Sequence, residues 1–182
     1  VLPGLAEESR QPPNILLILA DDLGVEGLSS YGGTSYATPR LDQLATEGMR
    51  FTHAFSTPYC SPTRASLLTG RYPFRNGIQE VIYDLDRHGD LFLQTDQPSV
   101  ARQLQEAGYA TAIAGKWQLS FLHQRDLIRE FGFDQYQCWQ IFAEDGSKTR
   151  RFHQPHYKRN GRILEGVEDR YGPDLNVEFL MA

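Results

Sequence analysis

The chain has 182 residues, of which 40% are hydrophobic, and a formal net charge of −5 at pH 7. This length and composition predict one globular domain with its own core, and the mildly acidic balance argues against a general nucleic-acid binder. No apolar run is long enough to span a membrane, and residues 1–13 resemble a polar, proline-bearing leader without a visible signal peptide.

A continuous apolar run at residues 14–20 opens the folded part of the chain, which we take as residues 14–182. The run is too short for a buried helix and does not alternate, so it predicts a central strand covered on both faces. Asp21 and Asp22 follow directly, at the end of a strand where ligands gather in open α/β sheets. Paired carboxylates suit a Ca²⁺ or Mg²⁺ ion, and a turn in which one aspartate caps the next element is the alternative.

A helix is predicted from Pro39, after a Thr38 cap, to a stop at Gly48. Its buried stripe would comprise Leu41, Leu44 and Ala45. The β-type residues at 49–55 then predict a returning strand, in which we expect His53 to be a hydrogen-bonded core group.

A loop that feeds a short helix comes next. Pro62 fits the first helical turn because the amide that it lacks would be unpaired there. Ser61 can cap this helix, and Gly70 can end it in a left-handed conformation. Cys60 is therefore expected just before a helix N-terminus, which favours an anionic nucleophile or ligand. Arg64 lies about one turn further along the helix, so its positive charge would point toward the same position as Cys60.

The order Cys-x-Pro-x-Arg, followed by Ala-x-Leu-Leu-Thr-Gly-Arg, occupies residues 60–71 and resembles the signature of the type I sulfatases in the alkaline phosphatase superfamily. The resemblance implies an α/β fold with a mixed, largely parallel central sheet flanked by helices, incomplete in this chain. It also implies that a formylglycine-generating or sulfatase-maturing enzyme oxidises Cys60 to formylglycine. Residues 14–24 look like the first metal motif of the family, so Asp21, Asp22 and residue 60 are expected to hold Ca²⁺ or Mg²⁺.

A second helix at residues 98–107 and a strand at residues 109–114 are predicted next. Lys116 follows the strand tip, where it would either extend to solvent or, as the resemblance implies, contact the sulfate. The family pattern continues with a histidine, but this chain has Gln118. Glutamine can donate a hydrogen bond but does not shuttle a proton near neutral pH. We therefore expect Gln118 either to position the substrate or to accompany reduced activity.

The last third of the chain is aromatic at first and then polar. Residues 136–142 predict a strand, with Cys138 as a small buried hydrophobic residue. Residues 143–173 are rich in arginine and histidine, which fits a solvated loop or hairpin or, alternatively, a substrate-facing loop for a polyanion. A final helix opens at Gly172, with Leu175 on its apolar face.

The resemblance implies a sulfuric ester hydrolase. Hydrated formylglycine at position 60 would attack the sulfate ester of a small molecule or, more specifically, a glycan, while Arg64 and Lys116 stabilise the charge on the sulfuryl oxygens. A phosphoesterase or phosphonate hydrolase of the same superfamily and an inactive, truncated glycan-binding fragment are the alternatives. The Asp-Asn metal pair of the family has no counterpart here, so we expect the N-terminal part of a larger periplasmic or secreted enzyme, inactive by itself.

Overall fold

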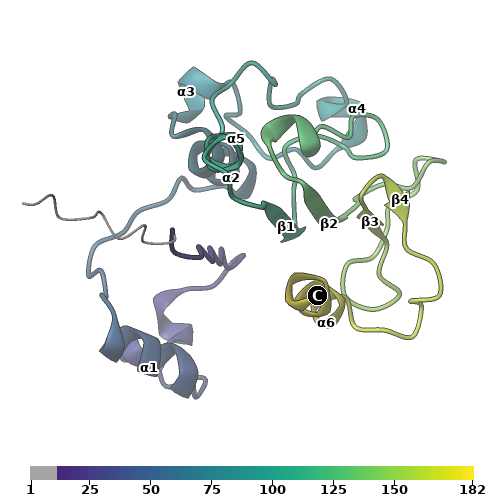
Figure 1. The fold of residues 1–182 in the computed structure, drawn as a ribbon. Coiled ribbons are helices and arrows are strands. Elements are labelled where there is room, and N and C mark those ends of the chain that lie inside the picture. The colour runs from purple at the N-terminus through teal and green to yellow at the C-terminus, as the bar shows by residue number, and fades with distance from the viewer. Residues whose placement is uncertain (1–11) are drawn as a thin grey trace, which may run out of the picture. The chain divides into compact units, whose positions relative to one another are not determined.

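The computed structural model describes residues 12–182 (Figure 1). The predicted leader therefore lies outside the described residues, apart from Pro12 and Pro13. The chain divides into two compact units, one that ends at Ala54 and one from Phe55 to Ala182.

The first unit contains two short 3-10 helices, Val25–Gly27 and Ser29–Tyr31, and the helix α1, Pro39–Glu47. The predicted bounds of α1 are confirmed, but the Thr38 hydroxyl bonds no helix amide. It lies 2.7 Å from the Ser29 hydroxyl and donates to the Asp42 carboxylate at 3.1 Å. Thr38 thus joins the start of α1 to the preceding loop through side chains.

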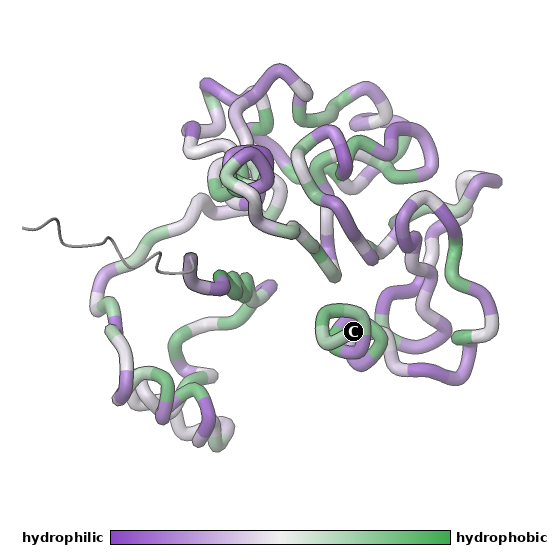
Figure 2. The backbone as a smooth tube through the Cα atoms, in the orientation of Figure 1, coloured by the Kyte–Doolittle hydropathy of each residue, from purple (hydrophilic) through white to green (hydrophobic). Residues whose placement is uncertain are grey.

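The strands predicted at residues 14–20 and 49–55 are wrong. Neither segment pairs with another part of the described chain, and the described residues of the first unit contain no strand to serve as a partner. An extended segment becomes a strand only when a neighbour accepts and donates its backbone hydrogen bonds. The apolar run at residues 14–20, a continuous hydrophobic stretch in Figure 2, consequently has side chains such as Leu16 that are 76% exposed.

Two packing predictions for the first unit are also wrong. Leu41 and Leu44 of α1 are 46% and 66% exposed, so they form no buried stripe within the described residues. His53 is exposed, and its ring nitrogen Nδ1 lies 3.1 Å from the hydroxyl of the adjacent Thr52. It is therefore not a core group.

The second unit is built on a four-stranded mixed sheet of order β1-β2-β3-β4. Its strands are β1 Ala112–Gly115, β2 Gln135–Trp139, β3 Tyr157–Arg159 and β4 Arg162–Ile163. β1 and β2 run parallel, whereas β3 is antiparallel to β2 and to β4. The expected mixed α/β fold is confirmed, with one parallel pairing in the described sheet.

Helices pack around this sheet. They are α2 Cys60–Thr69, α3 Pro73–Asn76, α4 Leu85–His88, α5 Val100–Glu106 and α6 Gly172–Met181, with one 3-10 turn at Arg129–Phe131. In Figure 1, α2 and α5 lie above β1 and β2, and α6, which packs against β1, lies below. One core of buried apolar side chains joins α2, the loops before and after α4, the 3-10 turn and β2. It includes Ala65, Ile82, Leu93, Phe131 and Cys138. This core holds the start of α2 beside the end of β1.

Candidate active site

Helix α2 begins at Cys60 itself. Tyr59, in an extended conformation, is the N-cap residue and forms no side-chain cap. The Thr63 hydroxyl donates to the Tyr59 carbonyl at 2.8 Å and lies 2.7 Å from the Thr57 hydroxyl, which fastens the entering loop to the first turn. Cys60 is a half-buried free cysteine in that turn, where backbone amides have no intrahelical acceptor. The structure thus confirms a cysteine at a helix N-terminus.

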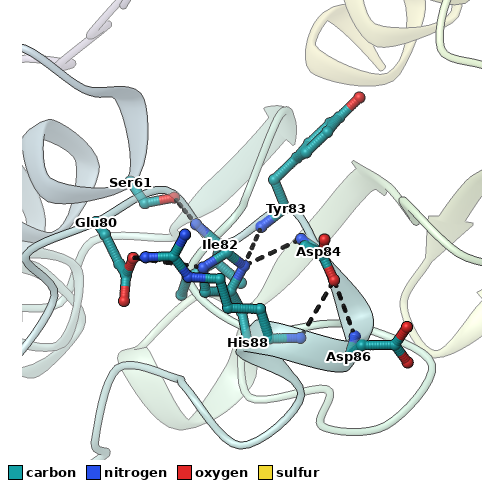
Figure 3. Close-up of polar contacts among 8 residues, drawn as sticks. Ser61, Glu80, Ile82, Tyr83, Asp84, Asp86 and His88 are labelled. Carbon is teal, nitrogen blue, oxygen red and sulfur yellow. Dashed lines mark hydrogen bonds and ion pairs between the residues drawn. The ribbon is translucent and has the colours of Figure 1, made fainter.

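Ser61 is not the helix cap that the sequence suggested. Its side chain is completely buried and donates to the Gln118 carbonyl at 2.9 Å. It also accepts a hydrogen bond from the Ile82 amide at 3.1 Å (Figure 3). One hydroxyl therefore ties the start of α2 to two segments that are remote in the sequence.

The Ser61→Ala variant is expected to lower the free energy of unfolding by roughly 2–4 kcal/mol, because it leaves a buried carbonyl and a buried amide without this partner. Urea unfolding of the complete polypeptide measures the loss. Ser66→Ala is the matched control, since the buried Ser66 hydroxyl of the same helix has no hydrogen-bond partner in the described structure. Equal losses in the two variants would contradict the bridging role of Ser61.

The loop whose Ile82 amide donates to Ser61 is held by its own polar contacts (Figure 3). The Asp84 carboxylate accepts hydrogen bonds from the amides of Asp86 and Arg87 at 3.0 and 3.2 Å and so caps α4. Nδ1 of the buried His88 accepts from the Asp84 amide at 3.1 Å. Hydrogen bonds therefore hold the 82–88 segment, which in turn bonds Ser61 next to Cys60.

Arg64 connects α2 to the tip of β1. Its Nη1 atom donates to the Lys116 carbonyl at 2.7 Å. β1 ends at Gly115, whose φ of +103° turns the chain sharply before Lys116. The helix that carries Cys60 and the strand end that carries Lys116 are thus joined by a charge-assisted hydrogen bond. The structure brings these two predicted site segments together.

Gln118 is part of the same turn. It has a positive φ of 55°, and its side chain is 3% exposed. Its Oε1 atom is buried and has no hydrogen-bond partner among the described residues. Such an atom is costly when unpaired, so this side chain is suited to accept a hydrogen bond from a group that enters the site.

His123 does not take the place of the missing histidine. Its ring centroid lies 6.1 Å from that of Phe121 and 6.2 Å from that of Phe142, in an aromatic cluster. Burial lowers its pKa below the ordinary value, which favours the neutral ring at pH 7. Nothing in these contacts links it to Cys60.

Asp21 and Asp22 belong to the first unit, in the bend after the apolar run. Asp21 is half-buried and Asp22 is exposed. Asp22 has a left-handed φ of 57°, a conformation that aspartate tolerates better than most residues. Their assignment as metal ligands stays a prediction.

The predicted ligands Asp21, Asp22 and Cys60 fit a hard divalent cation only in part. Between residues 12 and 182, no three histidine, cysteine, aspartate or glutamate side chains are grouped so that they could hold a metal ion. Two carboxylates offer hard oxygen atoms, but about six to eight are needed around Ca²⁺. A cysteine thiolate is a soft ligand and matches such an ion poorly. The carboxylates therefore fit the ion, and Cys60 fits it only after conversion to an oxygen-bearing group.

None of the helices in the described part of the chain has the length and apolar composition needed to cross a bilayer.

Comparison with known proteins identifies the relatives of this chain. A model of the sulfatase family matches residues 13–170. Arylsulfatase A from Bos taurus is 50% identical over 117 residues, a match that spans 64% of this chain and 22% of the bovine protein. An N-acetylgalactosamine-6-O-sulfatase from Bacteroides thetaiotaomicron is 45% identical over 113 residues, which span 62% of this chain and 22% of that protein.

A solved structure gives a similar result. Ps i-CgsB in complex with k-i-k-neocarrahexaose superposes with a TM-score of 0.74 and 28% sequence identity, and the match covers 91% of this chain and 39% of that one. The chain thus spans about a fifth of the length of the two curated relatives.

Proposed function

Because the chain belongs to the sulfatase family, we propose that it carries the nucleophile of a sulfuric ester hydrolase. The observation that supports this most directly is the placement of Cys60 in the first turn of α2, with Arg64 of the same helix bonded to the Lys116 carbonyl. In this proposal, one nucleophile position and two cationic side chains act together at the carboxyl end of β1. Ligands bind at this edge in open α/β folds.

We propose that a maturation enzyme oxidises Cys60 to formylglycine, whose hydrate supplies an oxygen nucleophile in place of a soft thiolate. Arg64 and Lys116 bind the sulfuryl oxygens and stabilise the negative charge that develops on them. The amides of the first helical turn favour the same charge. Gln118 orients the ester through its side-chain amide and transfers no proton near neutral pH.

Asp21 and Asp22 are the proposed metal ligands of this chain, and other groups complete the coordination of Ca²⁺ or Mg²⁺. When bound, the cation supplies positive charge that polarises the sulfate ester. The two carboxylates, which would otherwise repel each other, gain a shared counter-ion.

A sulfated carbohydrate is the proposed substrate. One relative is named for a sulfate on N-acetylgalactosamine, and one structural neighbour holds an oligosaccharide. The bovine relative is named an arylsulfatase, so small aromatic sulfate esters are also proposed as substrates. A periplasmic or secreted location stays a prediction.

We expect the complete, matured polypeptide to hydrolyse an aryl sulfate with a kcat/KM at least about 100-fold above that for the matching aryl phosphate. A phosphate monoester carries more negative charge and needs more cations than one metal site, Arg64 and Lys116 supply. Initial rates with the two esters, measured side by side, give the ratio. A ratio below one would replace the sulfatase proposal with the phosphoesterase alternative.

Chelation provides the control for the metal. Treatment with a chelator is expected to abolish aryl sulfate turnover, and added Ca²⁺ or Mg²⁺ to restore it. The Asp22→Asn variant should need a higher metal concentration for the same rate, because an amide binds the cation more weakly than a carboxylate. Full activity in the chelator would exclude the metal part of the proposal.

One observation favours a second candidate, a domain that binds sulfated glycans without turnover. Gln118 stands where the family pattern has a histidine, and it cannot serve as a general acid. Retention of a sulfated glycan together with no turnover of any aryl sulfate, in a protein with converted Cys60, would favour this candidate.

A further inference from the structure

One segment of this acidic protein is strongly basic. Residues 148–164 contain six lysines and arginines, two histidines and no aspartate or glutamate, while the chain as a whole has a net charge of −5. Two of these cations, both in β3, have side-chain partners: Lys158 pairs with Asp126 at 3.4 Å, and Nε of Arg159 donates to Gln137 at 2.8 Å. Arg150, Arg151 and His153 lie toward the other end of the segment.

Aromatic rings surround that end. The Arg151 guanidinium lies over the rings of Trp139 and Phe152, 5.4 and 4.5 Å from their centroids. The Phe152 and Tyr171 rings are stacked, with centroids 6.3 Å apart and an angle of 22° between their planes. The His153 ring lies 5.5 Å from that of Tyr171. We call these five residues the arginine–aromatic platform.

The stacked rings of the platform are exposed, whereas Arg151 and Trp139 are half-buried. Phe152 is 45% and Tyr171 43% exposed. Exposed apolar groups that cluster beside charged side chains are typical of binding surfaces. Guanidinium groups can stack on rings and still donate hydrogen bonds in their own plane, a combination suited to oxyanions.

The backbone under the platform is fixed. The Gly172 amide donates to the Phe152 carbonyl at 2.8 Å, and the Tyr157 hydroxyl donates to the Arg151 carbonyl at 3.2 Å. A Cβ atom at Gly172 would lie 2.1 Å from the Arg151 carbonyl oxygen, so only glycine allows this approach. The rings are therefore held in place before any ligand binds, which reduces the entropy cost of binding.

The base of the platform and Lys116 lie at the same end of two neighbouring strands. In the parallel pair of β1 and β2, Gly115 is in register with Cys138. Lys116 directly follows β1, and Trp139 is the last residue of β2, where it pairs with Tyr157 of β3, so a site residue and the base of the platform lie at the same end of the parallel pair. A ligand that reaches Lys116 can extend along this end of the sheet onto the platform.

We propose that the arginine–aromatic platform is a binding subsite for a sulfated oligosaccharide, in which Phe152 and Tyr171 hold the apolar faces of sugar rings and Arg151 pairs with a sulfate group. This inference rests on the proposed function. In these substrates, sugar rings combine an apolar face with negatively charged sulfate groups. The platform offers aromatic rings to the first and a guanidinium group to the second. The surrounding basic segment adds a field that attracts a polyanion.

Binding of a chondroitin 6-sulfate hexasaccharide to the complete polypeptide tests the subsite. The measurement uses the Cys60→Ala background, so the ligand is not consumed. Arg151→Gln and Phe152→Leu are each expected to weaken the affinity about tenfold. Arg129→Gln, which removes an exposed cation outside the basic segment, should leave the affinity unchanged. The chemically desulfated hexasaccharide should bind at least about tenfold more weakly than the sulfated one.

Three outcomes would overturn the inference. Wild-type affinity in both Arg151→Gln and Phe152→Leu would exclude the platform. If Arg129→Gln weakened the affinity equally, the effect of Arg151→Gln would come from net charge and not from the platform. Loss of binding to a linear polyphosphate in Phe152→Leu, equal to the loss for the hexasaccharide, would show that the ring does not recognise sugar. Because hydrolysis is not measured, these results are independent of whether aryl sulfates are turned over.

Discussion

The Cys60→Ala variant is expected to hydrolyse an aryl sulfate at least about 10⁴-fold more slowly than the matured wild-type protein, the size of effect typical for removal of a nucleophile. Residue 60 is the first residue of α2, so the methyl group of alanine fits the helix without disturbing it. Initial rates with saturating aryl sulfate measure the change in kcat. A loss in kcat with little change in KM would assign Cys60 to the chemical step rather than to binding.

Cys138 is the matched control for this experiment. It is the other cysteine of the chain, fully buried in β2, where burial raises the pKa of its thiol. Cys138→Ala leaves a small cavity and should lower stability by about 1 kcal/mol, but kcat at a permissive temperature should not change. Mass spectrometry of the peptide that contains residue 60 should reveal replacement of CH₂SH by CHO in the active protein. A Cys60→Ala protein with unchanged kcat would refute the proposed nucleophile.

Local signals in the sequence were sufficient for several elements. Pro39 and Gly48 bound α1, and Gly70, with a φ of 66°, ends α2 as expected. The apolar strand after Gly108 and the aromatic strand around Cys138 are β1 and β2, although both are shorter than predicted. Caps, stops and short apolar runs depend on neighbours in sequence, and a sequence reports these directly.

Features that depend on remote partners could not be predicted in this way. The run at residues 14–20 has the composition of a central strand, but no strand in the described residues pairs with it. The role of Ser61 depends on residues 82 and 118, and nothing in its local sequence indicates either contact. The same limit applies to the link between Arg64 and Lys116, because helical spacing orients a side chain but does not identify what it meets.

The candidate site was recognised from motif order, and the structure adds its internal connections. The sequence predicts Cys60 just before a helix, Arg64 within that helix and Lys116 after a strand end. Two hydrogen bonds, from Arg64 to the Lys116 carbonyl and from Ser61 to the Gln118 carbonyl, hold those two elements together. Side-chain to backbone bonds of this kind fix a catalytic group within a fraction of an ångström, which catalysis requires.

The Arg64→Lys variant is expected to lower kcat/KM for an aryl sulfate by about 10²–10³-fold, comparable with the loss of one preorganised donor to a developing anion. Arginine presents five N–H donors in one plane, so a single side chain can bond the Lys116 carbonyl and direct charge toward residue 60. A lysine ammonium is a compact charge on a flexible stem and cannot reproduce this planar array. Steady-state kinetics of the complete polypeptide measure the loss.

Arg71→Lys is the control for this charge-conserving change. Arg71 is an exposed residue that donates to Gln97 at 2.9 Å, beyond the end of α2. Its replacement should change kcat/KM by less than about twofold, because exposed polar pairs contribute little. If Arg64→Lys behaves like Arg71→Lys, positive charge alone is sufficient at residue 64, and the planar donor array is irrelevant. If only Arg64→Lys loses activity, mainly in kcat, the bond to Lys116 links the helix and the strand end as one preorganised site.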